Sequence, residues 1–152
     1  MSLSKLNPLC FFLLAVLIGC GSQPAETAPA EGGSVETDWP YEYVSTKSER
    51  KGFYNVSDTF AYSGDLNIEN LKAFCSEQYR QTDAEGFYYV VIFDAAENAG
   101  FPSYPLTAGY ALDEDLATHI RAVCEFNKIN GFAELRHYAK NSYESVPNVE
   151  PL

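Results

Sequence analysis

Residues 86–93 read Gly-Phe-Tyr-Tyr-Val-Val-Ile-Phe and contain no charged side chain. In a β-strand, successive side chains point to opposite faces. Both alternating sets of this run are apolar: Phe87, Tyr89, Val91 and Phe93 on one face, and Tyr88, Val90 and Ile92 on the other. A strand that is apolar on both faces is normally covered on both sides. We therefore predict a central strand that ends at Asp94.

The residues before this strand predict a hairpin and a helix. Residues 41–46 and 53–62 are rich in Tyr, Val, Thr and Phe, which favour strands, and the polar run 47–52 predicts the turn between them. A bulge or bend is expected near Ser57-Asp58. A helix is predicted over residues 67–80, capped by Asp65 or Asn67, because apolar residues recur there at helical spacing. Its apolar stripe comprises Ile68, Leu71, Cys75 and Tyr79.

A long loop is predicted directly after the central strand. Residues 95–111 contain Gly100, Pro102, Pro105 and Gly109, which exclude regular structure over most of this stretch. A loop of this length inside a compact domain is often functional. The alternative is a surface loop that covers one face of the sheet.

The remaining residues predict a second helix, a last strand and a tail. The helix is expected over 113–128, with Asp113 as its cap. Its predicted buried stripe comprises Leu116, Ile120, Val123, Cys124 and Asn127. Residues 132–139 predict the last strand, and residues 146–152, which include two prolines, predict a frayed tail.

This order of elements (ββαβαβ) indicates the α+β class. We predict a two-layer sandwich in which two helices lie on one face of a mixed sheet of about four to five strands. A doubly wound sheet is the competing topology. The predicted parts of the chain are a signal segment over 1–19, a tether over 20–38, one domain over 39–145 and the tail over 146–152.

The composition of the chain limits the kinds of partner that it is expected to bind. The formal net charge is −11, and the ten Lys and Arg residues are scattered along the chain. Nucleic acids and anionic lipid surfaces are bound by clustered basic residues, so neither is an expected partner. With 46% hydrophobic and 14% aromatic residues, the chain is too apolar to be disordered as a whole.

The first twenty residues have the parts of a secretory signal. Lys5 precedes an apolar run over residues 9–18, which is shorter than the roughly 20 residues that span a bilayer as a helix. The run ends in Leu17-Ile18-Gly19-Cys20, which resembles the lipobox of bacterial lipoproteins. The resemblance covers residues 1–20 only. It implies cleavage after Gly19, a diacylglyceryl group on the Cys20 thiol, and membrane attachment through lipid on Cys20, often with a further acyl chain on the new amine. A plain cleaved signal is the alternative.

The residues that follow Cys20 predict a tether. Residues 21–38 are rich in Gly, Pro, Ala, Ser and Glu and contain no aromatic residue. Such a segment is expected to be flexible, with a reach of roughly 25 Å. In enterobacterial lipoproteins an Asp after the lipidated cysteine favours the inner membrane, so Gly21 implies the outer membrane. The periplasmic face is favoured because no acidic run follows the cysteine.

Two cysteines would remain in the mature domain, Cys75 and Cys124. Each falls in the buried stripe of a predicted helix, so the two could meet if these helices pack side by side. Export to an oxidising compartment would then favour a disulfide. The alternative is a pair of separate buried thiols. No Cys-x-x-Cys motif points to a thiol-redox enzyme.

The ionisable residues predict no metal site and no cofactor. His119 and His137 are the only histidines, and they have no paired metal-ligand spacing. Asp94, Glu97 and Asn98 follow the central strand, where ligands of open sheets gather. Their oxygens could bind a cation or a polar ligand, although solvated turn residues are the simpler interpretation.

Tyrosines are the more distinctive candidates for binding. Tyr54, Tyr89 and Tyr138 are expected on the sheet face that the helices leave open, together with Phe87 and Phe93. Such a face would suit a protein, peptide or glycan partner. The first hypothesis is therefore a non-enzymatic binding module anchored in the envelope. The second is a small hydrolase-like enzyme using Asp94, Glu97, His119 or His137, and a structural envelope protein is a third.

Overall fold

The computed structural model describes residues 38–108, 110 and 113–152. The predicted signal segment, Cys20 and the predicted tether up to residue 37 lie outside these residues. Within the described part of the chain, no helix is both long and apolar enough to cross a membrane.

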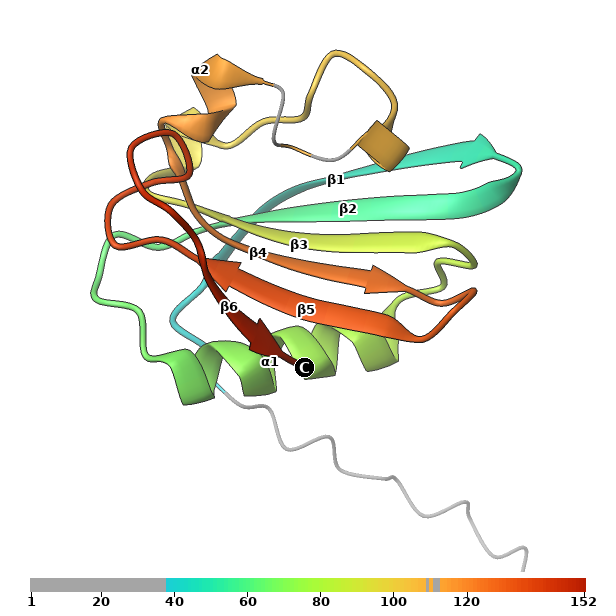
Figure 1. The fold of residues 1–152 in the computed structure, drawn as a ribbon, viewed down its shortest axis with the longest axis horizontal. Helices are drawn as coiled ribbons and strands as arrows, with labels where there is room; N and C mark the ends of the chain where they lie inside the picture. The colour runs from blue at the N-terminus through green and yellow to red at the C-terminus, as the bar shows by residue number, and fades with distance from the viewer. Residues whose placement is uncertain (1–37, 109, 111–112) are drawn as a thin grey trace, which may run out of the picture. The chain divides into compact units, whose positions relative to one another are not determined.

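The core of the fold is one mixed sheet of six strands, which neighbour one another in chain order. Only β2 and β3 are parallel, and the other neighbouring pairs are antiparallel (Figure 1). The strands are β1 Glu42–Lys51, β2 Phe53–Ala61, β3 Phe87–Phe93, β4 Ile120–Asn127, β5 Phe132–His137 and β6 Asn148–Pro151. The α+β class and the mixed sheet are thereby confirmed, while the predicted four to five strands become six.

The central position of β3 agrees with its sequence. It pairs with β2 on one side and β4 on the other, and every residue from Tyr88 to Phe93 is at most 2% exposed. Because β2 and β3 run parallel, the chain must cross over between them, and α1 makes this connection.

The hairpin of β1 and β2 is longer and tighter than predicted. β1 continues through residues 47–51, and the chain reverses at Gly52, whose φ is +80°. A left-handed backbone is freely available to glycine, so this residue permits the tight reversal. The irregularity expected near Ser57-Asp58 lies instead in β1, between Tyr43 and Ser45.

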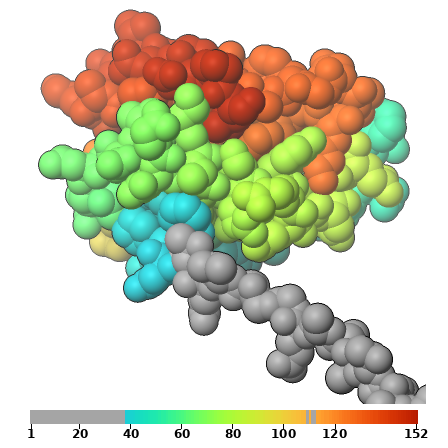
Figure 2. Space-filling view, turned by 90° about the horizontal axis from the view of Figure 1, so that it is seen from below, coloured from blue at the N-terminus to red at the C-terminus, as the bar shows by residue number. Residues whose placement is uncertain are grey.

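One face of the sheet is covered by α1, which spans Ile68–Gln81. The Asn67 side chain accepts a hydrogen bond from the Asn70 amide at 3.0 Å and caps the helix as predicted. In Figure 2, which views the molecule from this side, α1 (green) lies between the first described residues (cyan) and the C-terminal segment (red). The side chains that α1 buries are Leu71, Phe74 and Cys75.

Residues 113–128 do not form the predicted second helix. The helix α2 spans only Glu114–Ala117, and residues 120–127 form β4. The apolar residues of this region fit a period of two as well as a helical period: Ala122, Cys124 and Phe126 are buried beneath α1. Pairing with β3 and β5 decides between the two periods, because it provides both edges of β4 with hydrogen-bond partners.

The arrangement of two helices on one face is therefore wrong. The opposite face is covered by the described residues of the range 95–118 (95–108, 110 and 113–118), which we call the covering segment; it includes the short helices η1 (Ala96–Asn98), η2 (Leu106–Ala108) and α2. In Figure 1 this segment lies above the sheet and α1 below it. For the described residues 95–108 and 110, the alternative interpretation, a loop over one face, agrees with this arrangement.

The C-terminal residues are also more ordered than predicted. Residues 148–151, expected in a frayed tail, form β6 and pair with β5. Proline lacks a backbone N–H, but an edge strand pairs on one side only, so a short segment with prolines at its ends can still extend the sheet. The sheet therefore continues beyond residue 145.

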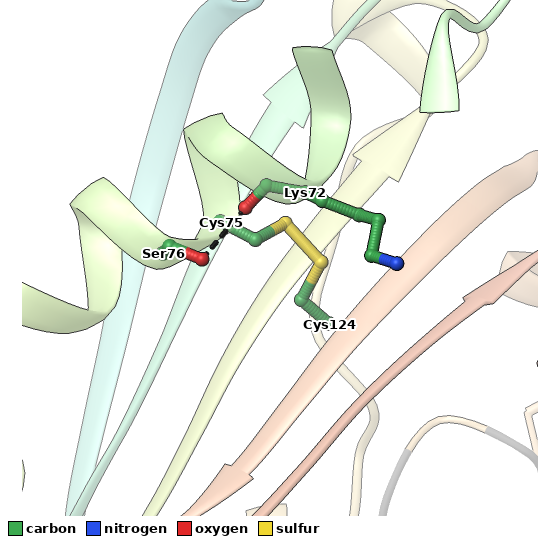
Figure 3. Close-up of a disulfide and its surroundings, with 4 residues drawn as sticks. All are labelled: Lys72, Cys75, Ser76 and Cys124. Atoms are coloured by element: carbon green, nitrogen blue, oxygen red, sulfur yellow. Dashed lines mark hydrogen bonds between the residues drawn. A yellow bond between two sulfur atoms is a disulfide. The ribbon is translucent and has the colours of Figure 1, made fainter. Parts of the chain in front are cut away.

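A disulfide joins Cys75 of α1 to Cys124 of β4, with a Cα–Cα distance of 6.3 Å (Figure 3). The predicted pairing is confirmed, although Cys124 lies on a strand and not on a helix. The bond attaches α1 covalently to the sheet. Both cysteines are fully buried.

Candidate functional site

The face beneath the covering segment differs from the α1 face in having buried polar side chains. Asn55, Ser57 and Thr59 alternate along β2 and are at most 1% exposed. The Ser57 hydroxyl hydrogen-bonds the Tyr110 hydroxyl at 2.7 Å, so a polar contact holds the covering segment against the sheet. Leu106, fully buried, adds an apolar contact on the same face.

A cavity of about 220 Å³ lies between the covering segment and the sheet. Strands β3, β4 and β5 supply part of its wall, and the covering segment supplies the part that faces them. Its main lining residues are Tyr89, Val123, Glu125, Arg136 and Tyr138 from the sheet side, and Thr107, Ala108, Tyr110 and Ala117 from the covering segment. A concave site with a few convergent polar groups is the usual form of a small-molecule site.

The charged part of the cavity is centred on Arg136. Its Nη1 lies 3.3 Å from Glu125 Oε2, and its Nε donates to Glu134 Oε1 at 2.7 Å. Burial raises the pKa of Glu125; Arg136 lowers it and Glu134 raises it further, and the net direction is upward. Two carboxylates face one guanidinium here, so the cluster is anionic when all three are ionised.

The tyrosines supply hydroxyl groups to the same cavity. Tyr89 is 2% exposed and lines the cavity. Burial raises the pKa of Tyr89, Tyr110 and Tyr138, so all three phenols are neutral at physiological pH. A neutral phenol can donate or accept a hydrogen bond.

Asp94 and His119 form a second cluster at the two ends of the covering segment. His119 Nδ1 lies 3.1 Å from Asp94 Oδ2, and Asn98 Nδ2 donates to Asp94 Oδ1 at 2.9 Å. Partial burial alone would raise the pKa of Asp94, but the hydrogen bonds from Asn98 and His119, with the charge of His119, outweigh it and lower that pKa. Each side chain of the pair is 38% exposed.

The predicted site residues are distributed over three places. Tyr89 and Tyr138 lie together at the cavity, as expected. Tyr54 lies on the opposite face, against the α1 core, with the Arg50 guanidinium over its ring. Asp94 and the exposed Glu97 line a different, more open hollow near the start of β1. Because Tyr89 is buried, the expected open tyrosine face does not exist at that position.

Glu125, Arg136 and Tyr110 were missed by sequence reasoning. The first two face the cavity because Glu125 pairs with Tyr89 across β3 and β4, and Arg136 pairs with Val123 across β4 and β5. Read as a strand, residues 120–127 place Val123 and Glu125 on the same face, because they are two residues apart. A helical interpretation of these residues concealed it.

The described part of the chain contains no group of three or more His, Cys, Asp or Glu side chains that could hold a metal ion. Comparison of the chain with models of protein families, with curated proteins and with solved structures found no match. The function is therefore argued from the chemistry of the cavity.

Proposed function

We propose that this chain is a lipid-anchored protein of the bacterial cell envelope that binds a small polar ligand in the cavity beneath its covering segment. The observation that carries the binding role is the cavity itself, in which Tyr89, Glu125 and Arg136 of the sheet face the covering segment across one enclosed space.

The anchor rests on the segment Leu17-Ile18-Gly19-Cys20. Acylation of Cys20 would place the domain at the membrane, and Gly21 favours the outer membrane and its periplasmic face. The disulfide between Cys75 and Cys124 supports export, because disulfides persist in oxidising compartments.

Cell fractionation tests the anchor. We expect the wild-type chain in the membrane fraction and Cys20→Ala in the soluble fraction, since two or three acyl chains give stable attachment and their loss removes it. Membrane association of Cys20→Ala that resists high salt would contradict the anchor. A Ser34→Ala control in the predicted tether should remain with the membranes.

Ligand capture tests the binding role. The full anchored chain in nanodiscs is incubated with a small-molecule extract of the cell envelope, and retained compounds are identified by mass spectrometry. Ala108→Trp should block the cavity, whereas Ser103→Trp places the same ring at an exposed position of the covering segment that does not line it. We expect a compound that wild type and Ser103→Trp retain and Ala108→Trp does not. Retention that is equal in all three proteins, or absent from all, would contradict the proposal.

A small envelope enzyme is the second candidate, and the Asp94–His119 pair is the observation that favours it. A carboxylate that orients an imidazole is a common arrangement in acid–base catalysis. However, among the described residues no Ser, Thr or Cys side chain hydrogen-bonds His119, and neither member of the pair lines the cavity. Labelling of wild type but not His119→Gln by a fluorophosphonate probe would favour the enzyme over the binding protein.

A further inference from the structure

We propose that the ligand of this cavity is a small amine in its protonated form, with the ammonium group beside Glu125 and Tyr89 and its hydrocarbon part against Ile120 and Val123. This inference rests on the proposed binding role of the cavity and names the chemical class of its ligand.

The charges around Arg136 favour a cation. Its guanidinium is already engaged by Glu125 and Glu134, at 3.3 and 2.7 Å. The side chains of these glutamates are only 20% and 22% exposed, so solvent screens the excess negative charge weakly. An ammonium ion would balance this excess, whereas an anion would add a third negative charge around Arg136. The net charge of −11 on the chain also attracts cations over longer distances.

The aromatic lining favours an ammonium ion over a metal ion. Tyr89 and Tyr110 meet edge to face with ring centroids 6.2 Å apart, and both line the cavity with Tyr138. Tyrosine rings attract organic cations through their negative faces. The Tyr89 hydroxyl at the cavity can accept a hydrogen bond from an ammonium N–H. No ring of carboxylates that would suit a metal ion accompanies Glu125 among the described residues.

The size and the remaining walls restrict the ligand further. A volume of about 220 Å³ lies below the roughly 300 Å³ at which sites for drug-sized ligands begin, so a compact molecule is expected. Ala117, Ile120 and Val123 form an apolar part of the wall, which suits a short hydrocarbon chain.

Isothermal titration of the full chain in nanodiscs of uncharged lipid tests this assignment with compounds of matched size. We expect butylammonium to bind at least about 10-fold more tightly than butanol, the difference that about 1.4 kcal/mol produces. Butyrate should not bind. The amino acid norvaline should bind more weakly than butylammonium, because its carboxylate adds a negative charge beside Glu125 and Glu134. Empty nanodiscs and the cavity-blocking Ala108→Trp are the blanks.

Two substitutions locate the ammonium group. Glu125→Gln should weaken butylammonium binding about 10-fold or more, and Tyr89→Phe by a smaller factor. Glu97→Gln removes an exposed carboxylate in the other hollow and should leave the affinity unchanged. The wild-type compound series decides the question even if Glu125→Gln does not fold.

The outcomes separate this inference from the proposed function. Equal or tighter binding of butanol, butyrate or norvaline, abolished by Ala108→Trp, would overturn the amine assignment while keeping the binding role. Failure of butylammonium to bind, when envelope compounds are retained at the cavity, would overturn it as well. If no envelope compound is retained either, both proposals fall.

Discussion

The two faces of the sheet are closed in different ways. On one face α1 packs aromatic and aliphatic side chains against the strands and is attached to β4 by a disulfide. On the other, an irregular segment rests on buried polar groups and leaves a cavity beside Glu125 and Arg136. Dense apolar packing stabilises a fold, whereas a binding site requires space and polar groups that a core excludes. The difference indicates that one face provides stability and the other recognition.

Strand β2 contributes to both faces, because its successive side chains point alternately to one face and the other. Val56 and Phe60 belong to the core beneath α1, while Ser57 and Thr59, between them in sequence, are buried beneath the opposite layer. A polar side chain on an interior face must find a hydrogen-bond partner. Tyr110 provides one for Ser57, and Ser45 provides one for Thr59.

The largest expected effect is the loss of an aromatic ring from the α1 face. Phe74 is 2% exposed, and its ring contacts those of Trp39, Tyr41 and Phe60. Phe74→Ala should lower the free energy of unfolding by about 3–5 kcal/mol, because it removes apolar contacts and leaves a cavity. Urea denaturation followed by circular dichroism measures the change.

The matched substitution on the other face is Phe101→Ala in the covering segment, where Phe101 is half-buried. We expect this substitution to lower the free energy of unfolding by less than half as much as Phe74→Ala does. Equal losses would mean that both layers stabilise the fold to the same degree, and the division between the faces would not hold.

Removal of the disulfide is the next largest perturbation. The double substitution Cys75→Ala and Cys124→Ala should cost about 2–4 kcal/mol, because the bond closes a loop with a sequence separation of 49 and thereby restricts the unfolded chain. Thermal unfolding measures the loss. Reduction of the wild-type chain should give a similar change, and an unaltered midpoint in both cases would show that α1 packing alone holds this face.

The α1 face was also the more predictable one. The helix over 68–81 and the strand over 87–93 follow from local patterns: helical spacing with a capping Asn67 in the first, and a run without charges in the second. The disulfide between Cys75 and Cys124 was one of two alternatives left open, and it is present although the second helix was wrong: Cys124 was expected beside α1 on a neighbouring helix and lies beneath α1 on β4. Local pattern and tertiary packing agree on this face.

The cavity could be predicted only in part, because it depends on strand register. Tyr89 and Tyr138 were placed together by alternation alone. Glu125 and Arg136 join them through the pairing of β4 with β3 and β5, which is a contact between residues far apart in sequence. The spacing of residues 116–127 fits a helix as well as a strand, so no local pattern could decide between them. The same holds for β6, which becomes a strand only by pairing with β5.

A smaller effect is expected where the covering segment meets β2. Tyr110→Phe removes the hydrogen bond between the Tyr110 and Ser57 hydroxyls and should cost about 1 kcal/mol. Hydrogen exchange should show faster exchange in the covering segment and unchanged protection in α1, since the contact belongs to one face only. Tyr143→Phe, at a side chain exposed to 60%, is the control and should change neither. Faster exchange of α1 in Tyr110→Phe would show that the two faces open together.

The smallest effect is expected at Asp94, where the two ends of the covering segment meet. The pKa of Asp94 is lower in the folded chain than its ordinary value of 3.8, so the folded state favours the carboxylate. The resulting stabilisation is complete above pH 3.8 and is lost as the pH falls through the lowered pKa. Because the pair with His119 is partly exposed, the contribution should stay below about 1 kcal/mol.

The free energy of unfolding should therefore be slightly lower for Asp94→Asn than for wild type at pH 7, and this difference should shrink below pH 3.8. Glu97→Gln tests the neighbouring carboxylate in the same hollow and should not reproduce this pH dependence. His119 and Asn98 hold Asp94 at the point where the covering segment leaves and rejoins the sheet, so the loss should appear first as faster hydrogen exchange in that segment. A difference that stays constant with pH would mean that Asp94 supports this face by packing, and that its charge does not help to hold the segment over the cavity.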